Sequence, residues 1–391
     1  MKIAMVFDKM LWGGIERVGV TYANILNKNG WEVDIYILDP ETESIEDEIT
    51  SNLKIIKINY KLSWCAENAW SLILSHDCYG LEIVAFCIKY FVCKLMKPIL
   101  YIRYGIHNKK YDVAIAFSGH IKDLTYVAEG YLKARHKVAW IHGAQYQYNM
   151  ISPGFFRIYK KIRNLVCLSE LCDAECKNYN LKNGINKVKI YNPCNIEAKI
   201  VDNNLVYELR RKYHDFSLMV GRLAKDKDQE FIIRCFKLLN DKYGIRKTLV
   251  LVGEGEKEEY LKSLVKNLHM EKIVIFLGTR TDVQNFYAAA TIYVHAAPLE
   301  GFPTVFMEAM FYGLPIITTD ALPGARELLG NDEYGLITPV GNIELFVDKL
   351  KQLYESPILQ KKYCEAGKKR VKRFAPEIIS NEILQYFIKF Y

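Results

Sequence analysis

The sequence predicts an α/β protein made of two doubly wound domains. Its 391 residues are too many for one ordinary domain, and two of about 190 residues each are the natural expectation. Short apolar runs alternate with amphipathic stretches along the whole chain, which indicates parallel sheets covered by helices. One polar stretch, at about 193–216, interrupts the alternation and is predicted to be the linker. We therefore expect one domain at 1–195 and a second at 196–375, followed by a final helix at 376–391.

The first half shows this alternation in order. The apolar run at 2–7 predicts a strand, and a loop at 8–17 leads into an amphipathic helix that ends near residue 28. Residues 64–105 are rich in aromatic and aliphatic side chains and predict two helices with basic residues between them. Further strands are predicted at 31–38, 53–60, 112–117, 137–143, 164–170 and 188–195, and a further helix at 121–132.

The second half repeats the pattern after the polar stretch. Each strand is followed by turn residues and a helix, as in parallel βα units. The predicted strands lie at 216–223, 248–256, 272–280, 292–297, 316–320 and 335–340, and two helices precede the last one at 376–391.

The stretch 292–320 carries the strongest chemical signal. A buried strand is followed by a turn and by a helix at about 304–312, which ends at Gly313. The start of such a helix offers free backbone N–H groups that suit a phosphate. Glu300 precedes the helix and Glu308 lies within it, roughly 12 Å away at most along the helix axis. One carboxylate can therefore hold a sugar while the other holds a ribose. An ordinary βαβ unit with two solvated glutamates is the alternative.

Two cations follow the first strand of the second half. Arg222 offers a bidentate fork and Lys227 a point charge, at the mouth of the predicted sheet. Together they suit a diphosphate leaving group. Surface charge at a helix start is the alternative, although a cation is disfavoured at that end of the dipole. Asp226 and Asp228 spell D-x-D beside these cations, but we expect no metal site there.

Other candidate residues lie at strand ends. Gly13 and Gly14 lack Cβ atoms and let the backbone approach a ligand, although a tight turn explains them equally well. His142 ends a predicted strand of the first half, where a structural histidine is the usual alternative. Arg280 follows a strand of the second half and is either a ligand contact or a surface charge.

Several of these segments resemble a known family. EGFPTVFMEA at 300–309, followed by GLPIITTD at 313–320, resembles the Glu-x7-Glu block of family 4 glycosyltransferases, which are retaining enzymes of the GT-B fold. GRLAKDK at 221–227 is similar to the Gly-Arg-Leu-x-x-x-Lys block of that family, and the Gly-Gly loop after the first strand is similar as well. The resemblance is strong at 217–340, moderate at 1–30 and 137–195, and weak at 60–110.

The resemblance implies two Rossmann-like domains facing across a cleft, with the acceptor bound by the first and the nucleotide sugar by the second. It also implies that the final helix at 376–391 crosses back to complete the first domain. It implies transfer with retention and no obligatory metal or other cofactor. Arg222 and Lys227 would stabilise the departing diphosphate, Glu300 would orient the donor sugar, and His142 would lie beside it. The residues implied to bind the donor are Gly13, Gly14, Arg222, Lys227, Arg280, Gly301, Phe302, Thr304, Val305 and Glu308, with Glu308 accepting from the ribose.

Charge suggests where the protein works. Over 51–200, 22 Lys and Arg face 10 Asp and Glu, a balance of +12 in a chain of net charge +8. No nucleic-acid-binding motif accompanies this charge, and no apolar run approaches the ~20 residues of a membrane span. The ten cysteines are scattered and predict reduced thiols. We expect a cytosolic protein, peripheral on the anionic inner face of the cell membrane. A merely solvated basic face is the alternative.

The expected activity is transfer of a hexose from a nucleotide sugar, with UDP as the expected nucleotide, to a lipid-linked glycan in bacterial capsule or other surface polysaccharide synthesis. A nucleotide-sugar epimerase of the same fold would not need Glu300 and Glu308 at this spacing. A non-catalytic nucleotide-sugar-binding protein would be expected to lack Arg222, Lys227 or Glu300, yet all three are present. Release of nucleoside diphosphate from nucleotide sugars, with and without acceptor, distinguishes these possibilities.

Overall fold

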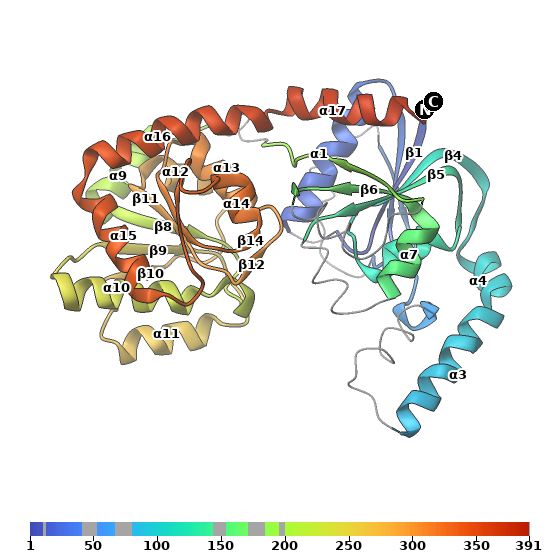
Figure 1. The fold of residues 1–391 in the computed structure, drawn as a ribbon, viewed down its shortest axis with the longest axis horizontal. Helices are drawn as coiled ribbons and strands as arrows, with labels where there is room; N and C mark the ends of the chain where they lie inside the picture. The colour runs from blue at the N-terminus through green and yellow to red at the C-terminus, as the bar shows by residue number, and fades with distance from the viewer. Residues whose placement is uncertain are drawn as a thin grey trace. The chain divides into compact units, whose positions relative to one another are not determined.

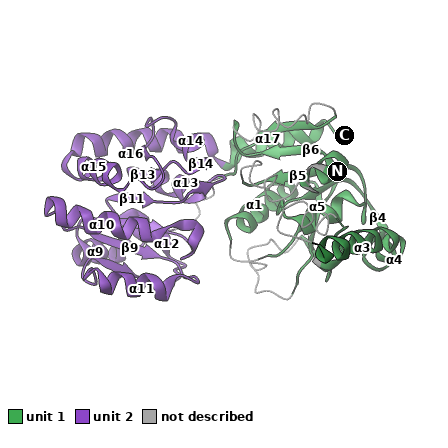
Figure 2. Cartoon of the chain, turned by 60° about the horizontal axis from the view of Figure 1, so that its bottom comes forward, with its two compact units in different colours: residues 1–193, 376–391 green, residues 194–375 purple. Residues whose placement is uncertain are grey.

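The computed structural model describes residues 1–10, 13–40, 53–66, 80–143, 154–170, 184–194 and 200–390. The chain forms two compact units (Figure 2). Unit 1 contains Met1–Pro193 and Pro376–Tyr391, and unit 2 contains Cys194–Ala375. The chain therefore passes from unit 1 to unit 2 and returns to unit 1 with its last helix.

Unit 1 is built on a seven-stranded parallel sheet in the order β3-β2-β1-β4-β5-β6-β7. The order reverses between β1 and β4, which is where open α/β sheets bind ligands. The strands are β1 (Lys2–Phe7), β2 (Glu32–Ile37), β3 (Lys54–Lys57), β4 (Ile106–Ala116), β5 (Leu132–Ile141), β6 (Arg163–Cys167) and β7 (Asn186–Lys189). The helices are α1 (Gly14–Lys28), α3 (Leu81–Leu95), α4 (Lys97–Tyr104), α5 (Ile121–Ala128), α7 (Gly154–Ile162) and α17 (Pro376–Ile388).

Unit 2 is built on a six-stranded parallel sheet in the order β10-β9-β8-β11-β13-β15. The order reverses between β8 and β11. The strands are β8 (Phe216–Val220), β9 (Thr248–Val252), β10 (Val274–Phe276), β11 (Ile292–His295), β13 (Ile316–Thr319) and β15 (Leu336–Thr338). The helices are α9 (Asn203–Tyr213), α10 (Gln229–Tyr243), α11 (Glu258–Asn267), α12 (Val283–Ala289), α13 (Thr304–Phe311), α14 (Gly324–Leu329), α15 (Ile343–Glu355) and α16 (Pro357–Val371).

The strand orders confirm the predicted architecture of two doubly wound α/β units. Figure 1 shows helices packed against the sheet of each unit. The central strands of both sheets are apolar and almost wholly buried, as strands covered on both faces must be, whereas the edge strands β3, β7 and β10 are partly exposed. Strands β4 and β5 begin earlier than predicted, because their first residues are polar and partly exposed while they still pair with each other.

The polar stretch predicted as a linker is part of unit 2. Its helix α9 packs on α12, and Arg210 Nη2 donates to the carbonyl of Ala288 over 2.7 Å. Asp202 caps α9 by accepting from the backbone N–H of Asn204 and Leu205. The segment that connects the two units is therefore shorter than the linker that the polar composition indicated.

The last helix, α17, packs on α1 within unit 1 (Figure 1). Its buried residues are Ile379, Ile383, Tyr386 and Phe387. The ring of Phe387 lies 6.1 Å from that of Trp31, and Phe390 stacks on His136 at 4.7 Å. The last helix thus contributes to the core of the first unit.

Candidate functional site

The loops after three neighbouring strands of unit 2 are joined by backbone hydrogen bonds. The N–H of Gly221 donates to Val252 over 2.9 Å, and the N–H of Gly253 donates to Gly278 over 2.8 Å. The N–H of Leu223 donates to Glu254 over 2.9 Å. These bonds hold the segment that carries Arg222 against its neighbours at the carboxyl edge of the sheet.

Two glycines make this close packing possible. A Cβ on Gly255 would lie 2.3 Å from the carbonyl oxygen of Leu223, and one on Gly253 would lie 2.1 Å from that of Gly221. Gly253 also has a φ of +135°, which other residues rarely adopt. The glycines of the segment 253–255 are therefore explained by contact between backbones.

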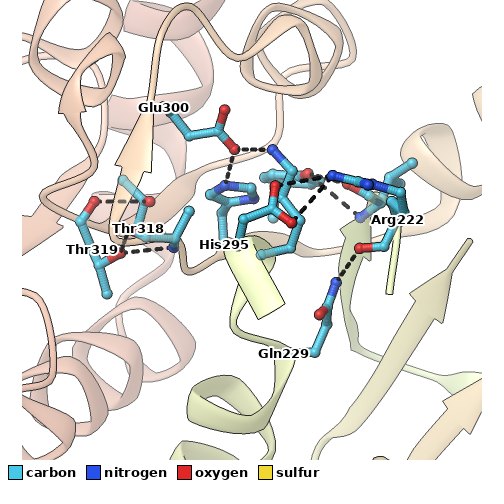
Figure 3. Close-up of polar contacts among 11 residues, drawn as sticks. Arg222, Gln229, His295, Glu300, Thr318 and Thr319 are labelled. Atoms are coloured by element: carbon cyan, nitrogen blue, oxygen red, sulfur yellow. Dashed lines mark hydrogen bonds and ion pairs between the residues drawn. The ribbon is translucent and has the colours of Figure 1, made fainter. Parts of the chain in front are cut away.

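Lys227, Glu300 and His295 meet where the strand order of unit 2 reverses (Figure 3). Lys227 follows β8, and its Nζ lies 2.5 Å from Oε1 of Glu300. His295 is the last residue of β11, and its Nε2 lies 3.1 Å from the same oxygen. His295 is fully buried, and the side chains of Glu300 and Lys227 are 11% and 24% exposed. The arrangement places a carboxylate between two nitrogen donors at the switch point of the sheet.

The surroundings keep Glu300 ionised. Burial by itself would raise the pKa of this carboxyl, but the hydrogen bond with His295 and the charge of Lys227 outweigh burial and lower its pKa to about 2. Glu300 therefore accepts hydrogen bonds at neutral pH and does not act as an acid. A carboxylate of this kind suits the hydroxyl groups of a sugar.

The segment around Glu300 is held by neighbouring strands. Thr319 Oγ1 bonds both the N–H and the carbonyl of Ala297, at 3.1 and 2.9 Å (Figure 3). The short strands β12 (Leu299–Glu300) and β14 (Leu322–Pro323) pair in parallel. Glu300 is thus positioned by contacts with β13 and β14 rather than by its own turn alone.

Arg222 is more accessible than Lys227. Its guanidinium is 63% exposed and contacts both carboxylate oxygens of Asp226 at 3.2 Å. The backbone carbonyl of Arg222 accepts from Gln229 Nε2 over 2.8 Å (Figure 3). Asp228, the other acidic residue of the D-x-D sequence, caps α10 by accepting from Phe231 N–H. Both aspartates therefore have local roles, and the structure leaves Arg222 able to exchange Asp226 for an anion.

Helix α13 begins at Thr304, one short turn after Glu300. Pro303 is its N-cap, and no side chain caps its first turn. In the described part of the chain, the backbone N–H groups of Thr304 and Val305 have no hydrogen-bond partner. Gly301 lies in the same turn, and Phe302 is buried against the ring of Phe374 at 5.6 Å. The free N–H groups give the start of α13 its capacity for an anion.

Glu308 lies within α13 among tyrosines. Burial first, and then the nearby charge of Glu308, raise the pKa of Tyr287, Tyr293 and Tyr312. The rings of Tyr287 and Tyr293 stack at 5.7 Å, and Tyr293 Oη donates to the carbonyl of Val220 over 3.2 Å. These tyrosines link Glu308 to the end of β8.

Arg280 has a local ion-pair partner. Its Nε and Nη2 atoms donate to the two carboxylate oxygens of Asp282 at 2.8 and 2.7 Å. The side chain is 42% exposed, and its guanidinium lies 5.5 Å from the ring of Phe286. Arg280 is therefore partly exposed and paired locally, and its contact with the donor stays a prediction.

The remaining predicted residues belong to unit 1. His142 follows β5, is buried, and places Nε2 2.7 Å from the carbonyl oxygen of Phe117. Burial lowers the pKa of His142 to about 4, so the ring is neutral and Nε2 carries the donated proton. Its Nδ1 has no partner among the described residues. One ring nitrogen is thus committed to the fold, and the other is left as an acceptor.

Gly13 and Gly14 begin helix α1. Gly13 is the N-cap, and a Cβ there would lie 2.2 Å from the Oε2 atom of Glu16. The absence of a side chain at Gly13 therefore makes room for a buried carboxylate of the same helix. Residues 11 and 12 of the predicted loop lie outside the described residues.

Sequence reasoning missed His295. A histidine inside an otherwise apolar strand was the available signal, because a buried polar ring requires a partner. The partner, Glu300, lies five residues later in the chain, beyond the turn.

Comparison with known proteins identifies the chain. The family described as glycosyl transferases group 1 matches residues 207–370, which make up most of unit 2. An uncharacterized glycosyltransferase of Haemophilus influenzae is 27% identical over 351 residues, covering 89% of this chain and 88% of that protein. The chain is a glycosyltransferase, and its residues 207–370 match group 1.

Two further proteins resemble this glycosyltransferase over its whole length. A GalNAc-alpha-(1->4)-GalNAc-alpha-(1->3)-diNAcBac-PP-undecaprenol alpha-1,4-N-acetyl-D-galactosaminyltransferase of Campylobacter jejuni is 24% identical over 389 residues, 98% of each chain. Anabaena HepE, solved in complex with UDP and glucose, aligns over the full length of both chains with a TM-score of 0.75 at 17% identity. The likeness to HepE extends the shared fold to both units.

Proposed function

We propose that this glycosyltransferase moves a sugar from a UDP-sugar to a lipid-linked glycan with retention of anomeric configuration. The observation that carries the donor assignment is the meeting of Lys227, Glu300 and His295 at the switch point of unit 2. The buried, ionised carboxylate can accept hydrogen bonds from the hydroxyl groups of a sugar. The neighbouring lysine and the uncapped helix start can bind the negative charge of a diphosphate. UDP as the nucleotide and a lipid-linked acceptor rest on the resemblance to the proteins described above.

In this proposal several residues of unit 2 together stabilise the departing UDP. Arg222 releases Asp226 and binds the diphosphate together with Lys227, so that the negative charge that grows as the bond breaks is neutralised. The N–H groups of Thr304 and Val305 bind the same phosphates, and Glu308 accepts from the ribose. Glu300 accepts from hydroxyl groups of the transferred sugar. No metal is assigned a role.

Two matched substitutions test this division. Glu300→Gln should lower turnover at least tenfold with little change in the affinity for UDP, because the carboxylate contacts only the sugar. Glu308→Gln should weaken the binding of UDP itself, because the ribose is present both in UDP and in the UDP-sugar. The measurements are UDP release from UDP-sugars and calorimetric titration with UDP. Equal loss of UDP affinity in both variants would contradict the division of roles.

A panel of nucleotides and UDP-sugars tests the identity of the donor. Thermal shifts with UDP, GDP and ADP should show the largest stabilisation by UDP, since a bound ligand stabilises the folded state by mass action. UDP-glucose, UDP-galactose and their N-acetyl forms are then compared for UDP release with and without an undecaprenyl-diphosphate-linked oligosaccharide. A protein that releases UDP at the same rate in both cases is not a transferase to that acceptor. Anomeric configuration is read from the product by NMR.

The proposed location rests on helix α3. No helix in the described part of the chain has the length and apolar character needed to cross a bilayer. Yet Val84, Ile88, Phe91 and Leu95, at helical spacing on one face, are each 53–79% exposed. Figure 1 shows α3 extending away from the sheet of unit 1. An outward apolar face is expected of a helix that lies in a membrane interface.

Basic residues accompany this face. Lys89 and Lys94 lie on α3, and Lys94, Lys97 and Lys161 surround the single carboxylate of Glu129. Three cations around one anion leave a net positive charge, which favours anionic headgroups. Lys160 is exposed beside them, and Arg163 begins β6. We therefore propose that unit 1 rests on the inner face of the cell membrane through α3, where the lipid-linked acceptor is held.

Vesicle binding tests this location. The wild type should co-sediment with vesicles containing phosphatidylglycerol, less so at high salt. The double variant Ile88→Ser with Phe91→Ser should remain in the supernatant. Ile358, on α16 of unit 2, is 84% exposed and makes a matched control, because Ile358→Ser removes an exposed isoleucine without touching α3. Equal binding of all three proteins would refute a role for this helix.

A further inference from the structure

A buried tyrosine lies where β8 and β11, the two strands at the switch point of unit 2, part from each other. β8 pairs with β9 over its whole length, from Phe216 to Val220. Its register with β11 covers only Ser217 and Leu218. Val220, the last residue of β8, therefore lies beyond the paired part of β8 and β11, and its backbone needs other partners on that side.

The hydroxyl of Tyr293 supplies these partners. Tyr293 is a fully buried residue of β11, and its own backbone is in register with Leu218. Its Oη donates to the carbonyl oxygen of Val220 over 3.2 Å and accepts from the N–H of Val220 over 3.4 Å. One side-chain hydroxyl thus takes the place of strand pairing at the end of β8.

The segment that follows Val220 carries Arg222. On the β9 side this segment is held by the bond from the N–H of Gly221 to the carbonyl of Val252. On the β11 side the strand end is held by Tyr293 Oη. The guanidinium of Arg222 is 63% exposed, so the packing of its side chain does little to orient it. The position of the backbone after Val220 therefore decides where the guanidinium can reach.

The ring of Tyr293 contacts the other half of the donor site. It stacks on His295, with centroids 6.4 Å apart and an interplanar angle of 15°, and it meets Phe306 edge-on at 6.2 Å. His295 donates to Glu300 (Figure 3), and Phe306 lies in the first turn of α13. The ring therefore supports the carboxylate and the helix start, whereas the hydroxyl bonds the end of β8. A phenylalanine would keep the first role and lose the second.

We propose that Tyr293 is a positioning residue that fixes Arg222 for the diphosphate through the bond of its hydroxyl to Val220. This inference rests on the proposed function, in which Arg222 binds the diphosphate of UDP. Tyr293 acts through the backbone and is assigned no contact with the ligand. Without the hydroxyl, the end of β8 and Arg222 must be ordered when the diphosphate binds, and that cost lowers the affinity. Uridine carries no phosphate, so its affinity should not depend on the hydroxyl.

The variant Tyr293→Phe tests this role on the full-length protein. In calorimetric titrations its Kd for UDP should rise at least fivefold, whereas its Kd for uridine should stay within twofold of wild type. The stoichiometry of each titration gives the folded fraction, so a loss of folded protein is not mistaken for a loss of affinity. UDP release at saturating UDP-sugar should fall at least tenfold, because the charge on the diphosphate grows as the bond breaks.

A double-mutant cycle shows whether Tyr293 acts through Arg222. Arg222→Ala removes the guanidinium that the hydroxyl is proposed to position. Adding Tyr293→Phe to Arg222→Ala should therefore change the Kd for UDP less than twofold. Two independent residues would instead give the same factor in both backgrounds. A general loss of stability does not produce such a coupling.

Tyr354→Phe is the matched control. The hydroxyl of Tyr354 lies 2.7 Å from Oγ of Ser217, near the beginning of the same strand β8. The variant also removes a tyrosine hydroxyl that bonds β8, but at the end of the strand far from Arg222. It should lower the thermal stability, as Tyr293→Phe should, and leave the Kd for UDP unchanged.

The outcomes separate this inference from the proposed function. A wild type that binds UDP while Tyr293→Phe binds it within twofold as tightly overturns the positioning role and leaves the transferase intact. An equal loss of affinity for UDP and uridine also overturns that role, as does a cycle without coupling. A wild type that binds UDP yet transfers no sugar overturns the proposed function alone. A wild type that does not bind UDP overturns both proposals together.

Discussion

Arg222 and Lys227 carry the same charge in different surroundings. Arg222 is largely exposed and paired with an exposed aspartate, whereas Lys227 is mostly buried against Glu300. Either substitution by alanine should remove a charge-assisted contact to the leaving diphosphate, about 1.5–3 kcal/mol each, and lower turnover roughly 10- to 100-fold. Only Lys227→Ala should also lower stability, by about 1–3 kcal/mol, because it leaves the Glu300 carboxylate buried with one partner.

UDP release and thermal unfolding measure the two effects separately. Lys225 lies in the same short turn as Lys227 and is exposed, so Lys225→Ala is the control for charge alone. Equal thermal stability of the Arg222 and Lys227 variants would contradict the structural role of the Lys227–Glu300 pair.

Glu300 should also leave a signature in the pH dependence of stability. Its pKa is about 2 in the folded state against an ordinary value of 4.5. A carboxyl whose pKa is lowered by folding contributes stability above pH 4.5, on the order of 3 kcal/mol, and loses it as pH falls toward 2. The difference in the free energy of unfolding between wild type and Glu300→Gln should therefore shrink from pH 6 to pH 3 in urea titrations. Glu344→Gln, which alters a carboxylate that is 64% exposed, is the control variant.

At the scale of elements, the pair β12–β14 positions Glu300. Gly324 begins α14 directly after β14, and a Cβ there would lie 2.8 Å from the carbonyl oxygen of Gly301 and 2.9 Å from that of Glu300. Gly324→Ala must therefore displace the backbone that carries the carboxylate. Since a displacement near 1 Å can cost about 10²-fold in rate, turnover should fall at least tenfold while UDP affinity changes little.

A second glycine provides the comparison. Gly367 lies inside α16, where a Cβ would lie 3.3 Å from the side chain of Met310 and 3.6 Å from its Cα, the latter an ordinary van der Waals contact. Gly367→Ala should leave turnover unchanged and raise stability by up to about 1 kcal/mol, because alanine favours a helix interior. Turnover of Gly324→Ala equal to that of Gly367→Ala would show that the position of Glu300 does not depend on β14.

The same elements explain what the sequence could predict. The start of α13, its end at Gly313 and the carboxylates on either side of its first turn are local features, and local spacing identified them. The partners of those residues are not local: His295 meets Glu300 across a turn, and Gly324 meets it across two strands. The bond from Tyr293 to Val220 joins residues 73 positions apart. Only the strand order brings such residues together, and one sequence does not specify that order.

At the scale of the whole molecule, the sequence predicted two units because the alternation of strands and helices restarts after a polar stretch. The expected second domain at 196–375 already contained α9, but the polar composition could not show that this helix packs on α12, because a charged amphipathic helix is equally compatible with a linker. The return of the chain with α17 was predictable from resemblance, but its contribution to the first core was not. The structure assigns Phe387 of that helix to the core beside Trp31.

This connectivity predicts that a substitution near the C-terminus weakens the unit that contains the N-terminus. All five tryptophans, at 12, 31, 64, 70 and 140, lie in unit 1, so tryptophan fluorescence reports the unfolding of that unit alone. Phe387→Ala removes a fully buried ring and should cost about 3–5 kcal/mol, lowering the midpoint of the fluorescence transition in urea. Leu350→Ala, in the core of unit 2, should lower the midpoint of urea unfolding that circular dichroism measures. It should leave the midpoint of the fluorescence transition unchanged. If both variants moved the fluorescence transition equally, the two units would unfold as one, and α17 would not act on the first core alone.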